Sequence, residues 1–237
     1  MSFSTWTPPA VSSEAFAWRG QVWRMVESQH IAATMKLVDN RDEQDLLESL
    51  LESSKPNRSD DTTALDYLLA TPFRYDPKRG GSRFRAVNDP GVFYGAESVR
   101  TAGAELGYWR WKFLQDAIDL ERLEPVAHTA FQAEIATSVL DLQHPPFDEH
   151  EAIWQHPTEY ELTQHLARVA REANIGGILY RSVRDLQPSI CLALLTPIGF
   201  AKLKPNDQQQ TWYLAVSPHE VTLRRDNESM QFATAGW

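Results

Sequence analysis

Cysteine is almost absent from this sequence. Only Cys191 occurs among 237 residues, which excludes an intrachain disulfide and a metal cluster held by several thiolates. Cys191 lies in the apolar run "SICLALL", which is typical of a buried strand. We interpret it as an inert core thiol.

Long apolar runs and an excess of basic charge are also missing. No stretch approaches the roughly 20 apolar residues that a membrane-spanning helix needs. The opening "MSFSTWTPPAV" lacks the basic and apolar segments of a secretion signal, so a soluble cytoplasmic protein is expected. Asp and Glu number 32 against 23 Lys and Arg, a net charge of −9, which argues against direct binding to nucleic acid.

Apolar residues are plentiful, in contrast. They make up 42% of the chain and include eight tryptophans, enough for the core of one large domain. Periodicity predicts strands over 21–28, 91–96, 126–142, 178–183, 190–195, 211–217 and 220–226, and helices over 42–53, 60–70, 99–123 and 160–174. Strands and helices do not alternate regularly, so we predict an α+β fold.

The two helices predicted near residues 30–70 have two interpretations. The first, "DEQDLLESLLES", places four leucines at helical spacing opposite acidic residues, and the second is "DDTTALDYLLA". We expect Asp61 or Thr62 to cap the second helix and Pro72 to stop it. The pair could be an inserted interaction surface or a helical layer packed on the domain.

The helix predicted over 99–123 carries a lone glutamate, Glu105. Its apolar stripe should be the core face, formed by Val99, Ala102, Leu106, Trp109 and Phe113. At about 100° per residue, Glu105 lies roughly 70° from the centre of that stripe. A carboxylate at this margin can face a cleft, although most such glutamates only flank a core.

Arginines gather at three places that could bind an anion. They are Arg24 on the first predicted strand, Arg83 and Arg85 after Gly80-Gly81, and Arg181 and Arg184 around Ser182 in "YRSVRD". A glycine turn beside arginines suits pyrophosphate, because backbone N–H groups and guanidinium forks both favour anions. The alternative is that these arginines pair with the many acids of the chain. Ser182 lacks a Gly-x-Ser-x-Gly elbow, so we expect it to hydrogen-bond and not to act as a nucleophile.

Four histidines in the segment 144–165 do not indicate a metal site. His144, His150, His156 and His165 are separated by six, six and nine residues, which does not bring two ligands onto one helical turn. We therefore predict no metal and interpret the segment as a solvated acidic loop.

The order of five motifs resembles the RES-domain family, toxins of bacterial toxin–antitoxin pairs. The motifs are "VWRMV", "GSRFR", "GVFYGAESVRTAGAE", "GGILYRSVRD" and "CLALL", and the resemblance spans roughly residues 20–200. It implies an ADP-ribosyltransferase-like fold, a split antiparallel sheet flanked by helices, with a helical insertion near 30–70. We expect a lead-in over 1–20, the RES domain over 21–217 and a C-terminal strand or tail over 218–237.

The resemblance also implies an activity. NAD would bind as a substrate, with no further cofactor, and its nicotinamide–ribose bond would be cleaved by hydrolysis or phosphorolysis. A protein ADP-ribosyltransferase using the same site is one alternative, and a noncatalytic interaction domain working through the leucine-rich helices is another. An RNA-cleaving toxin fits poorly with the acidic pI near 5.3. The implied partner is an Xre-like helix-turn-helix antitoxin, and a homodimer remains open.

Individual residues carry the resemblance. Glu105, Arg83, Ser182 and Tyr94 match the catalytic positions, and Arg24, Arg83, Arg85 and Tyr94 are the candidates for binding NAD. Glu105 would stabilise the positive charge that develops on the ribose, while the arginines hold the pyrophosphate. Tyr94 would offer a flat face to a ring, and Ser182 a hydroxyl that orients the substrate. "GSRF" stands where the family has Gly-Gly-Arg-Trp, and Arg85 is a second candidate for the same role as Arg83.

Overall fold

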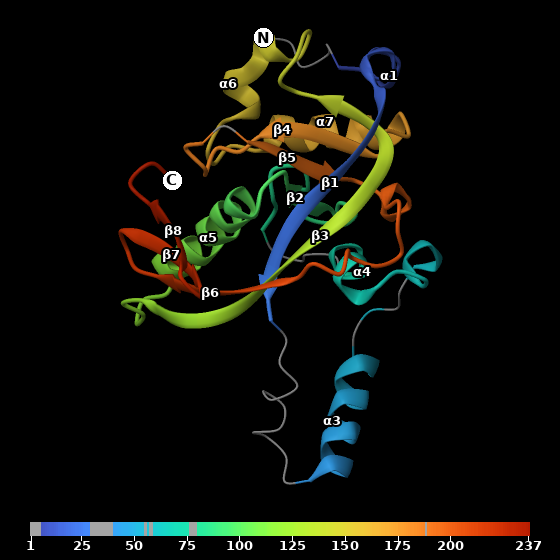
Figure 1. The fold of residues 1–237 in the computed structure, drawn as a ribbon. Helices are drawn as coiled ribbons and strands as arrows, with labels where there is room; N and C mark the ends of the chain where they lie inside the picture. Colours follow the sequence, from blue (N-terminus) through green and yellow to red (C-terminus); the bar gives the residue numbers. More distant parts are fainter. Residues whose placement is uncertain (1–5, 29–39, 55, 57–58, 76–79, 188) are drawn as a thin grey trace.

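The computed structural model describes residues 6–28, 40–54, 56, 59–75, 80–187 and 189–237. Eight strands form one sheet, with helices packed around it (Figure 1). The strands are β1 (Phe16–Glu27), β2 (Phe93–Ala96), β3 (Leu123–Asp141), β4 (Gly177–Arg181), β5 (Ile190–Leu194), β6 (Gln210–Val216), β7 (Glu220–Arg225) and β8 (Glu228–Ala233). The α-helices are α1 (Pro8–Glu14), α3 (Arg41–Ser53), α4 (Tyr67–Arg74), α5 (Val99–Asp116), α6 (Glu151–Trp154) and α7 (Glu161–Glu172).

The sheet is split along its longest strand. The strand order is β1-β2-β5-β4-β3-β6-β7-β8, and β1 also pairs with β3, so the first five strands close into a ring. One edge of β3 pairs with β1, while the other is shared between β6 over Leu123–Ala130 and β4 over Val139–Asp141. The predicted α+β fold with a split sheet is confirmed. One detail differs, since the β3–β4 pair is parallel within an otherwise antiparallel sheet.

Residues 6–20 are not a loose lead-in, which corrects the prediction for the described part of that segment. Thr7 caps α1 through a hydrogen bond from the Ala10 N–H, and Val11 is fully buried. β1 then begins at Phe16 and pairs with β3 from its first residue. The prolines start a helix here because proline is tolerated in the first helical turn, where its missing N–H would be unpaired anyway.

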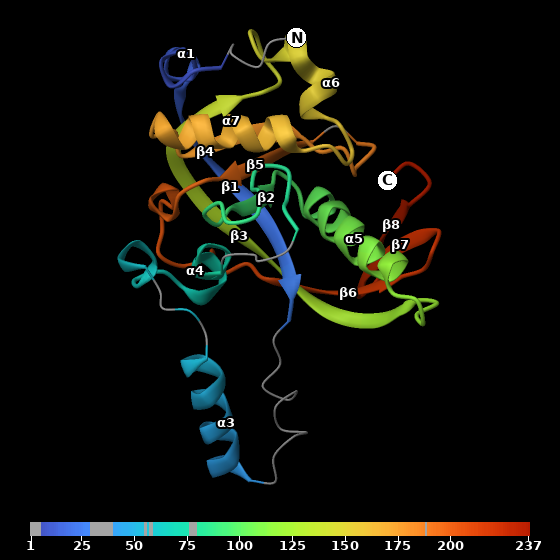
Figure 2. The ribbon, with the colours of Figure 1, turned by 180° about the vertical axis from the view of Figure 1, so that it is seen from behind.

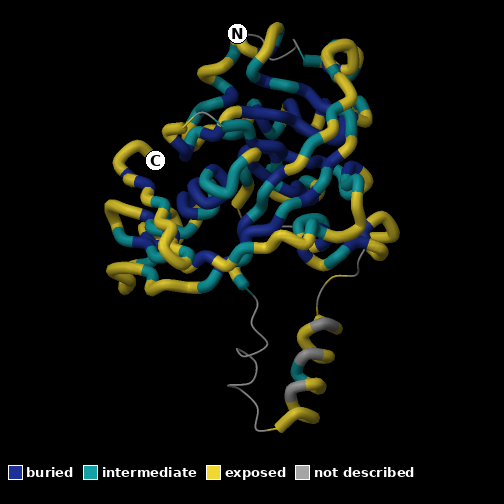
Figure 3. The backbone as a smooth tube through the Cα atoms, viewed as in Figure 1, coloured by how far each residue is buried: buried dark blue, intermediate teal, exposed yellow. Residues whose placement is uncertain are grey.

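The two helices of the 30–70 region differ in how they pack. In α4, Leu69 and Ala70 are buried against the sheet, as in a helical layer on the domain. The cap of α4 is Asp66, not Asp61 or Thr62, and Pro72 lies inside the helix, which runs on to Arg74. In α3, Leu46, Leu50 and Leu51 are exposed instead and Leu47 is half-buried, and the helix projects away from the sheet (Figures 1 and 3). Residues 29–39 lie outside the described part of the chain.

α5 buries a different face from the predicted one. Ser98 caps the helix, but Trp109 and Phe113 of the predicted core stripe are 42% and 54% exposed. The buried face contains Gly103 and Gly107, where an added Cβ would lie 2.5 Å from Leu223 and 2.8 Å from Val221. Because Gly103 and Gly107 have no side chains, the backbone of α5 packs closely on the side chains of β7. The helix buries this face, and not the face that carries Trp109 and Phe113.

The C-terminal segment is a hairpin, which corrects the prediction of a single strand or tail. β7 and β8 are joined at Asp226, whose φ is 48°, and they extend the sheet beyond β6. The indole of Trp237 packs against Tyr108 and Trp111 of α5, with ring centroids 6.0 and 6.2 Å apart. The segment 218–237 is therefore part of the domain. Figure 2 shows α5 beside this hairpin and α7 across β4 and β5.

No helix among the described residues combines the length and apolar character required to cross a bilayer.

Candidate active site

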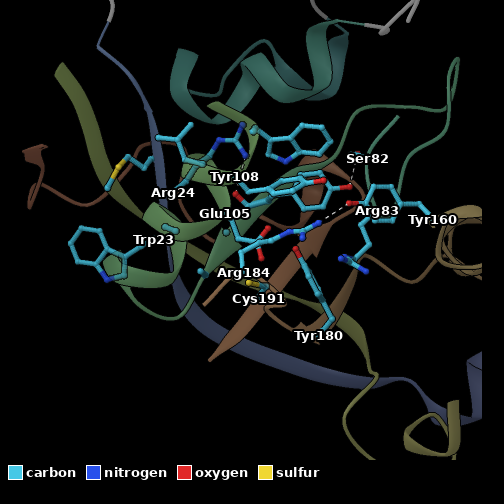
Figure 4. Close-up of a pocket in the computed structure, with 17 residues that line it drawn as sticks. Trp23, Arg24, Ser82, Arg83, Glu105, Tyr108, Tyr160, Tyr180, Arg184 and Cys191 are labelled. Atoms are coloured by element: carbon cyan, nitrogen blue, oxygen red, sulfur yellow. Dashed lines mark hydrogen bonds between the residues drawn. The ribbon is translucent and has the colours of Figure 1, made fainter. Parts of the chain in front are cut away.

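A cavity of about 250 Å³ opens where β1 and β2 part. These strands pair at Trp23 and Ala96 alone, whereas β1 continues along β3 as far as Glu27. β1, β2, the turn before β2, α5, β4 and β5 all contribute to its walls, with further side chains from the loops at Tyr160 and Arg184 (Figure 4). Four predicted site residues line it, namely Arg24, Arg83, Tyr94 and Glu105.

Glu105 and Ser182 meet at this cavity, although 77 residues separate them in the sequence. The Ser182 hydroxyl donates to Glu105 Oε1 at 2.6 Å. Burial of the carboxyl group raises the pKa of Glu105, while the Ser182 hydrogen bond and then the charges of Arg83 and Arg184 act in the opposite direction. A carboxylate in a site with little water interacts strongly with any positive charge that develops beside it.

One polar face of α5 holds the loop that carries Ser182. Thr101, Glu105 and Tyr108 share this face, because residues three and four apart are neighbours on a helix. Thr101 donates to the buried carboxylate of Asp185 at 2.9 Å, and the Tyr108 ring lies 3.4 Å from the Arg184 guanidinium carbon. Three contacts in a row therefore fix the loop on the helix.

Arg83 is buried and oriented by main-chain carbonyls. Its Nη1 donates to the carbonyl oxygens of Trp154 at 2.7 Å and His156 at 2.9 Å. The guanidinium also lies over the Tyr160 ring, 4.9 Å from its centroid. Neither Nε nor Nη2 of Arg83 bonds to another described residue, so both remain for an anion in the cavity.

The Tyr94 hydroxyl holds the turn on which Arg83 stands. It accepts a hydrogen bond from the Phe84 N–H at 3.0 Å and shares another with the Ser82 hydroxyl at 2.7 Å. Its two partners flank Arg83 in the chain. Tyr94 thus both lines the cavity and positions the neighbouring arginine.

Arg24 and Arg85 are placed differently from each other. The Arg24 side chain donates from Nη1 to the Tyr94 carbonyl at 2.9 Å and lies over the Phe93 ring, at the cavity edge. Burial lowers the pKa of Arg24 to about 10, so it stays cationic at neutral pH. Arg85 is not among the residues that line the cavity. Of the two candidates after the glycine turn, Arg83 is therefore the one in the site.

Comparison with known proteins now gives the family. A family model described as the RES domain matches residues 55–217, well over half of the chain. The chain belongs to the RES domain family. Comparison with curated proteins finds no match.

Among solved structures, a chain of the crystal structure of the M. tuberculosis MbcT–MbcA toxin–antitoxin complex is similar. The TM-score is 0.50 at 11% sequence identity, and the match covers 98% of this chain and 94% of that chain. At this identity the likeness shows the fold alone. The RES domain of this chain therefore shares its fold with a chain of that complex.

The sequence interpretation named Arg184 among the arginines that could bind an anion, but neither Arg184 nor Tyr160 was among the site residues expected for this RES domain. Arg184 Nη2 donates to the Tyr160 hydroxyl at 3.2 Å and to the Pro157 carbonyl. Arg184 and Tyr160 both line the cavity (Figure 4). Tyr160 thereby contacts two arginines, because its ring also meets Arg83. Arg184 could have been found from its place two residues after Ser182. Tyr160 precedes a helix and has no comparable signal.

Cys191 and Tyr180 form a second, apolar side of the cavity. Cys191 is 1% exposed, as expected for a core thiol in a strand, and burial raises its pKa well above the usual value. Burial likewise raises the pKa of Tyr180, so both groups stay neutral at physiological pH. Within the described residues, no three side chains of His, Cys, Asp or Glu converge as metal ligands would.

Proposed function

We propose that this RES domain cleaves the nicotinamide–ribose bond of NAD, as the toxin of a bacterial toxin–antitoxin pair. One observation carries the proposal. A half-buried carboxylate, Glu105, is oriented by Ser182 in a cavity that Arg24, Arg83 and Arg184 also line. One anionic group among three cations suits a substrate with a negative pyrophosphate and a reaction centre that becomes positive.

The chemistry would proceed by departure of nicotinamide. When the bond between C1′ and the pyridinium nitrogen breaks, its electron pair goes to nitrogen and nicotinamide leaves as a neutral molecule. The ribose becomes an oxocarbenium-like cation, and Glu105 beside it would lower the energy of this state. The hydrogen bond from Ser182 favours the ionised form of Glu105, which is the form that stabilises a cation.

An acceptor then attacks C1′. With water the product is ADP-ribose and one proton is released, and with inorganic phosphate the product carries a phosphate on C1′. The three arginines that line the cavity, Arg24, Arg83 and Arg184, would keep the pyrophosphate in place, so that C1′ stays beside Glu105. A protein side chain as acceptor would use the same residues and would make the domain an ADP-ribosyltransferase.

The partner we propose is an antitoxin. The structural neighbour comes from a toxin–antitoxin complex, and the RES domain resembles toxins that an Xre-like protein inhibits. NAD is the molecule that such a toxin would deplete in the cytoplasm. With a net charge of −9, operator binding would belong to the antitoxin and not to this chain.

The deciding experiment measures NAD loss and nicotinamide release by purified protein, with and without phosphate. Wild-type protein should consume NAD, and Glu105→Ala should abolish the loss while circular dichroism stays native. Glu172→Ala is the matched control, because Glu172 is exposed at the end of α7. Dependence on phosphate would identify phosphorolysis. If folded wild-type protein leaves NAD intact in every buffer, cleavage of free NAD is wrong and an interaction role takes its place.

A further inference from the structure

A second cavity, of about 290 Å³, lies on the α4 side of the sheet. Its floor is formed by β1, β3 and β6 and its wall by α4. Ten residues line it, namely Arg24, Val26, Glu27, Ser28, Tyr67, Leu68, Thr71, Pro72, Thr129 and Thr211. Of these residues, the sequence had predicted only Arg24 as a site residue.

Arg24 belongs to both cavities. Among the described residues, it alone lines both the cavity of Glu105 and this second cavity, so Arg24 lies between the two spaces. Val22 and Val26 share the face of β1 with Arg24 and pack towards α4, whereas Trp23 and Met25 face the other side. Arg24 therefore lies where β1 and β2 diverge, directly after their pair at Trp23 and Ala96. Its Nε is buried and has no hydrogen-bond partner among the described residues.

The first cavity is too small for a whole dinucleotide. Pockets that enclose a drug-sized ligand measure about 300–1,000 Å³. The cavity at Glu105 measures about 250 Å³, which suits one nucleotide half. Since a pyrophosphate joins the two halves of NAD, the second half must lie beyond the arginine that holds this link.

The lining of the second cavity suits an adenosine. The Tyr67 ring is 52% exposed at its mouth and is available to stack on a base. Val26, Leu68 and Pro72 provide apolar surface, while the hydroxyls of Thr71 and Thr211 can bond to ribose or base. The Glu27 carboxylate is paired with Arg110, so it does not repel a nearby phosphate as an isolated charge would.

We infer that the second cavity binds the adenosine monophosphate half of the substrate, with Arg24 at the pyrophosphate between the two cavities. This inference rests on the proposed function and adds to it the direction in which NAD lies. The nicotinamide half faces Glu105 and the adenosine half faces α4. It gives α4 a role in substrate binding, besides packing.

The test fills the second cavity without touching the first. Thr211 is exposed on β6 and lines only the second cavity, so Thr211→Trp should block it. Tyr213→Trp is the matched control, because Tyr213 is 54% exposed on the same strand and lines neither cavity. AMP binding is measured by calorimetry, and the kcat and KM for NAD by nicotinamide release.

Thr211→Trp should weaken AMP binding by at least about tenfold and raise the KM for NAD similarly, with kcat within about threefold of wild type. Tyr213→Trp should match wild type in AMP binding and in the KM and kcat for NAD. Tyr67→Ala removes the ring that would stack on the base, and it should weaken AMP binding by roughly 5- to 150-fold.

Two results would overturn the inference. One is that wild-type protein does not bind AMP, and the other is that Thr211→Trp binds AMP and NAD as wild type does. Failure of the proposed function is a separate result. If AMP binding depends on Thr211 but NAD is never cleaved, the cavity assignment stands without the activity. If NAD is cleaved and the cavity variants change nothing, the activity stands without the assignment.

Discussion

Glu105 is the residue on which the proposed chemistry depends, and its burial disfavours the ionised form of its carboxyl group. Burial raises its pKa, and the nearby Asp185 carboxylate acts in the same direction. Ser182, Arg83 and Arg184 act in the opposite direction. A carboxylate kept in such a place costs folding free energy and persists at functional sites.

Replacing Glu105 by Gln should therefore separate activity from stability. We expect cleavage of NAD to fall by roughly 10²–10³-fold, the loss typical for one preorganised electrostatic group. The free energy of unfolding at pH 7 should stay equal or rise. The reason is that the pKa of Glu105 in the folded wild type lies above its ordinary value of 4.5. As pH rises above 4.5, the unfolded chain loses the Glu105 proton more readily than the folded chain does, so the folded wild type becomes less stable relative to the unfolded chain.

The pH dependence of the stability of Glu105→Gln tests whether the pKa of Glu105 is raised or lowered in the folded state. Urea denaturation of wild-type protein and Glu105→Gln should show a difference in stability at pH 7 that narrows as pH falls and closes below 4.5, where both states of the wild type bind the proton. A variant that is clearly less stable than wild type at pH 7 would contradict the assigned direction of the shift.

Ser182 should act through Glu105. Without the hydrogen bond at 2.6 Å, the pKa of Glu105 should rise further, because that bond favours the ionised form. In Ser182→Ala we expect the acid limb of the kcat profile to move to higher pH and the rate at neutral pH to fall about tenfold. Loss of rate with an unmoved acid limb would show that Ser182 serves only the packing of its loop.

At the scale of elements, the site exists because two strands separate and one helix bridges the gap. β1 and β2 pair only at Trp23 and Ala96, and α5 follows β2 directly with Ser98 as its cap. The polar face of α5 then binds the loop after β4. The loop is also held from its other side, since the Trp237 indole donates to the Arg184 carbonyl at 3.0 Å.

Trp237 should therefore be a positioning residue. Trp237→Leu removes both the ring contacts with Tyr108 and the hydrogen bond to Arg184, and should lower the free energy of unfolding by about 1–3 kcal/mol. The KM for NAD should rise, because Arg184 loses its support. Trp237→Phe keeps an aromatic ring but not the N–H, so it should retain most of the stability and share the raised KM. An unchanged KM in both variants would exclude a positioning role.

At the scale of the whole molecule, the cavity needs more than the segment that matches the family. The match covers residues 55–217, yet Arg24 comes from β1 before it and Trp237 from the hairpin after it. β1 pairs with β3 along its full length of 12 residues, so it belongs to the same sheet. α3 does not belong to the packed domain in this way, because Leu46, Leu50 and Leu51 on it are exposed.

Substitutions in α3 should leave both the stability and the proposed activity unchanged. Leu46 and Leu50 are 60% and 58% exposed, and exposed positions usually change the free energy of unfolding by no more than about 0.5 kcal/mol. Leu46→Ser with Leu50→Ser should thus unfold at the wild-type urea concentration and release nicotinamide at the wild-type rate. A large loss of stability would show that this helix packs on the domain.

The sequence by itself determined the fold class and most of the site's membership. Alternation and capping predicted the strands and the helix that begins after Ser98, because these signals are local. Motif order predicted that Arg83, Tyr94 and Glu105 belong to one site, and all three line one cavity. Their proposed catalytic and binding roles stay predictions.

Only the tertiary structure decided which face of α5 is buried and what surrounds Glu105. Trp109 and Phe113 satisfied the periodicity of a core stripe, but Gly103 and Gly107 allow the backbone to approach β7, and that contact depends on residues more than 100 positions away. The same holds for Tyr160 and Trp237, which meet Arg184 across loops with no local pattern. Local periodicity specifies how a segment folds, whereas long-range packing selects its neighbours, and the site is made of those neighbours.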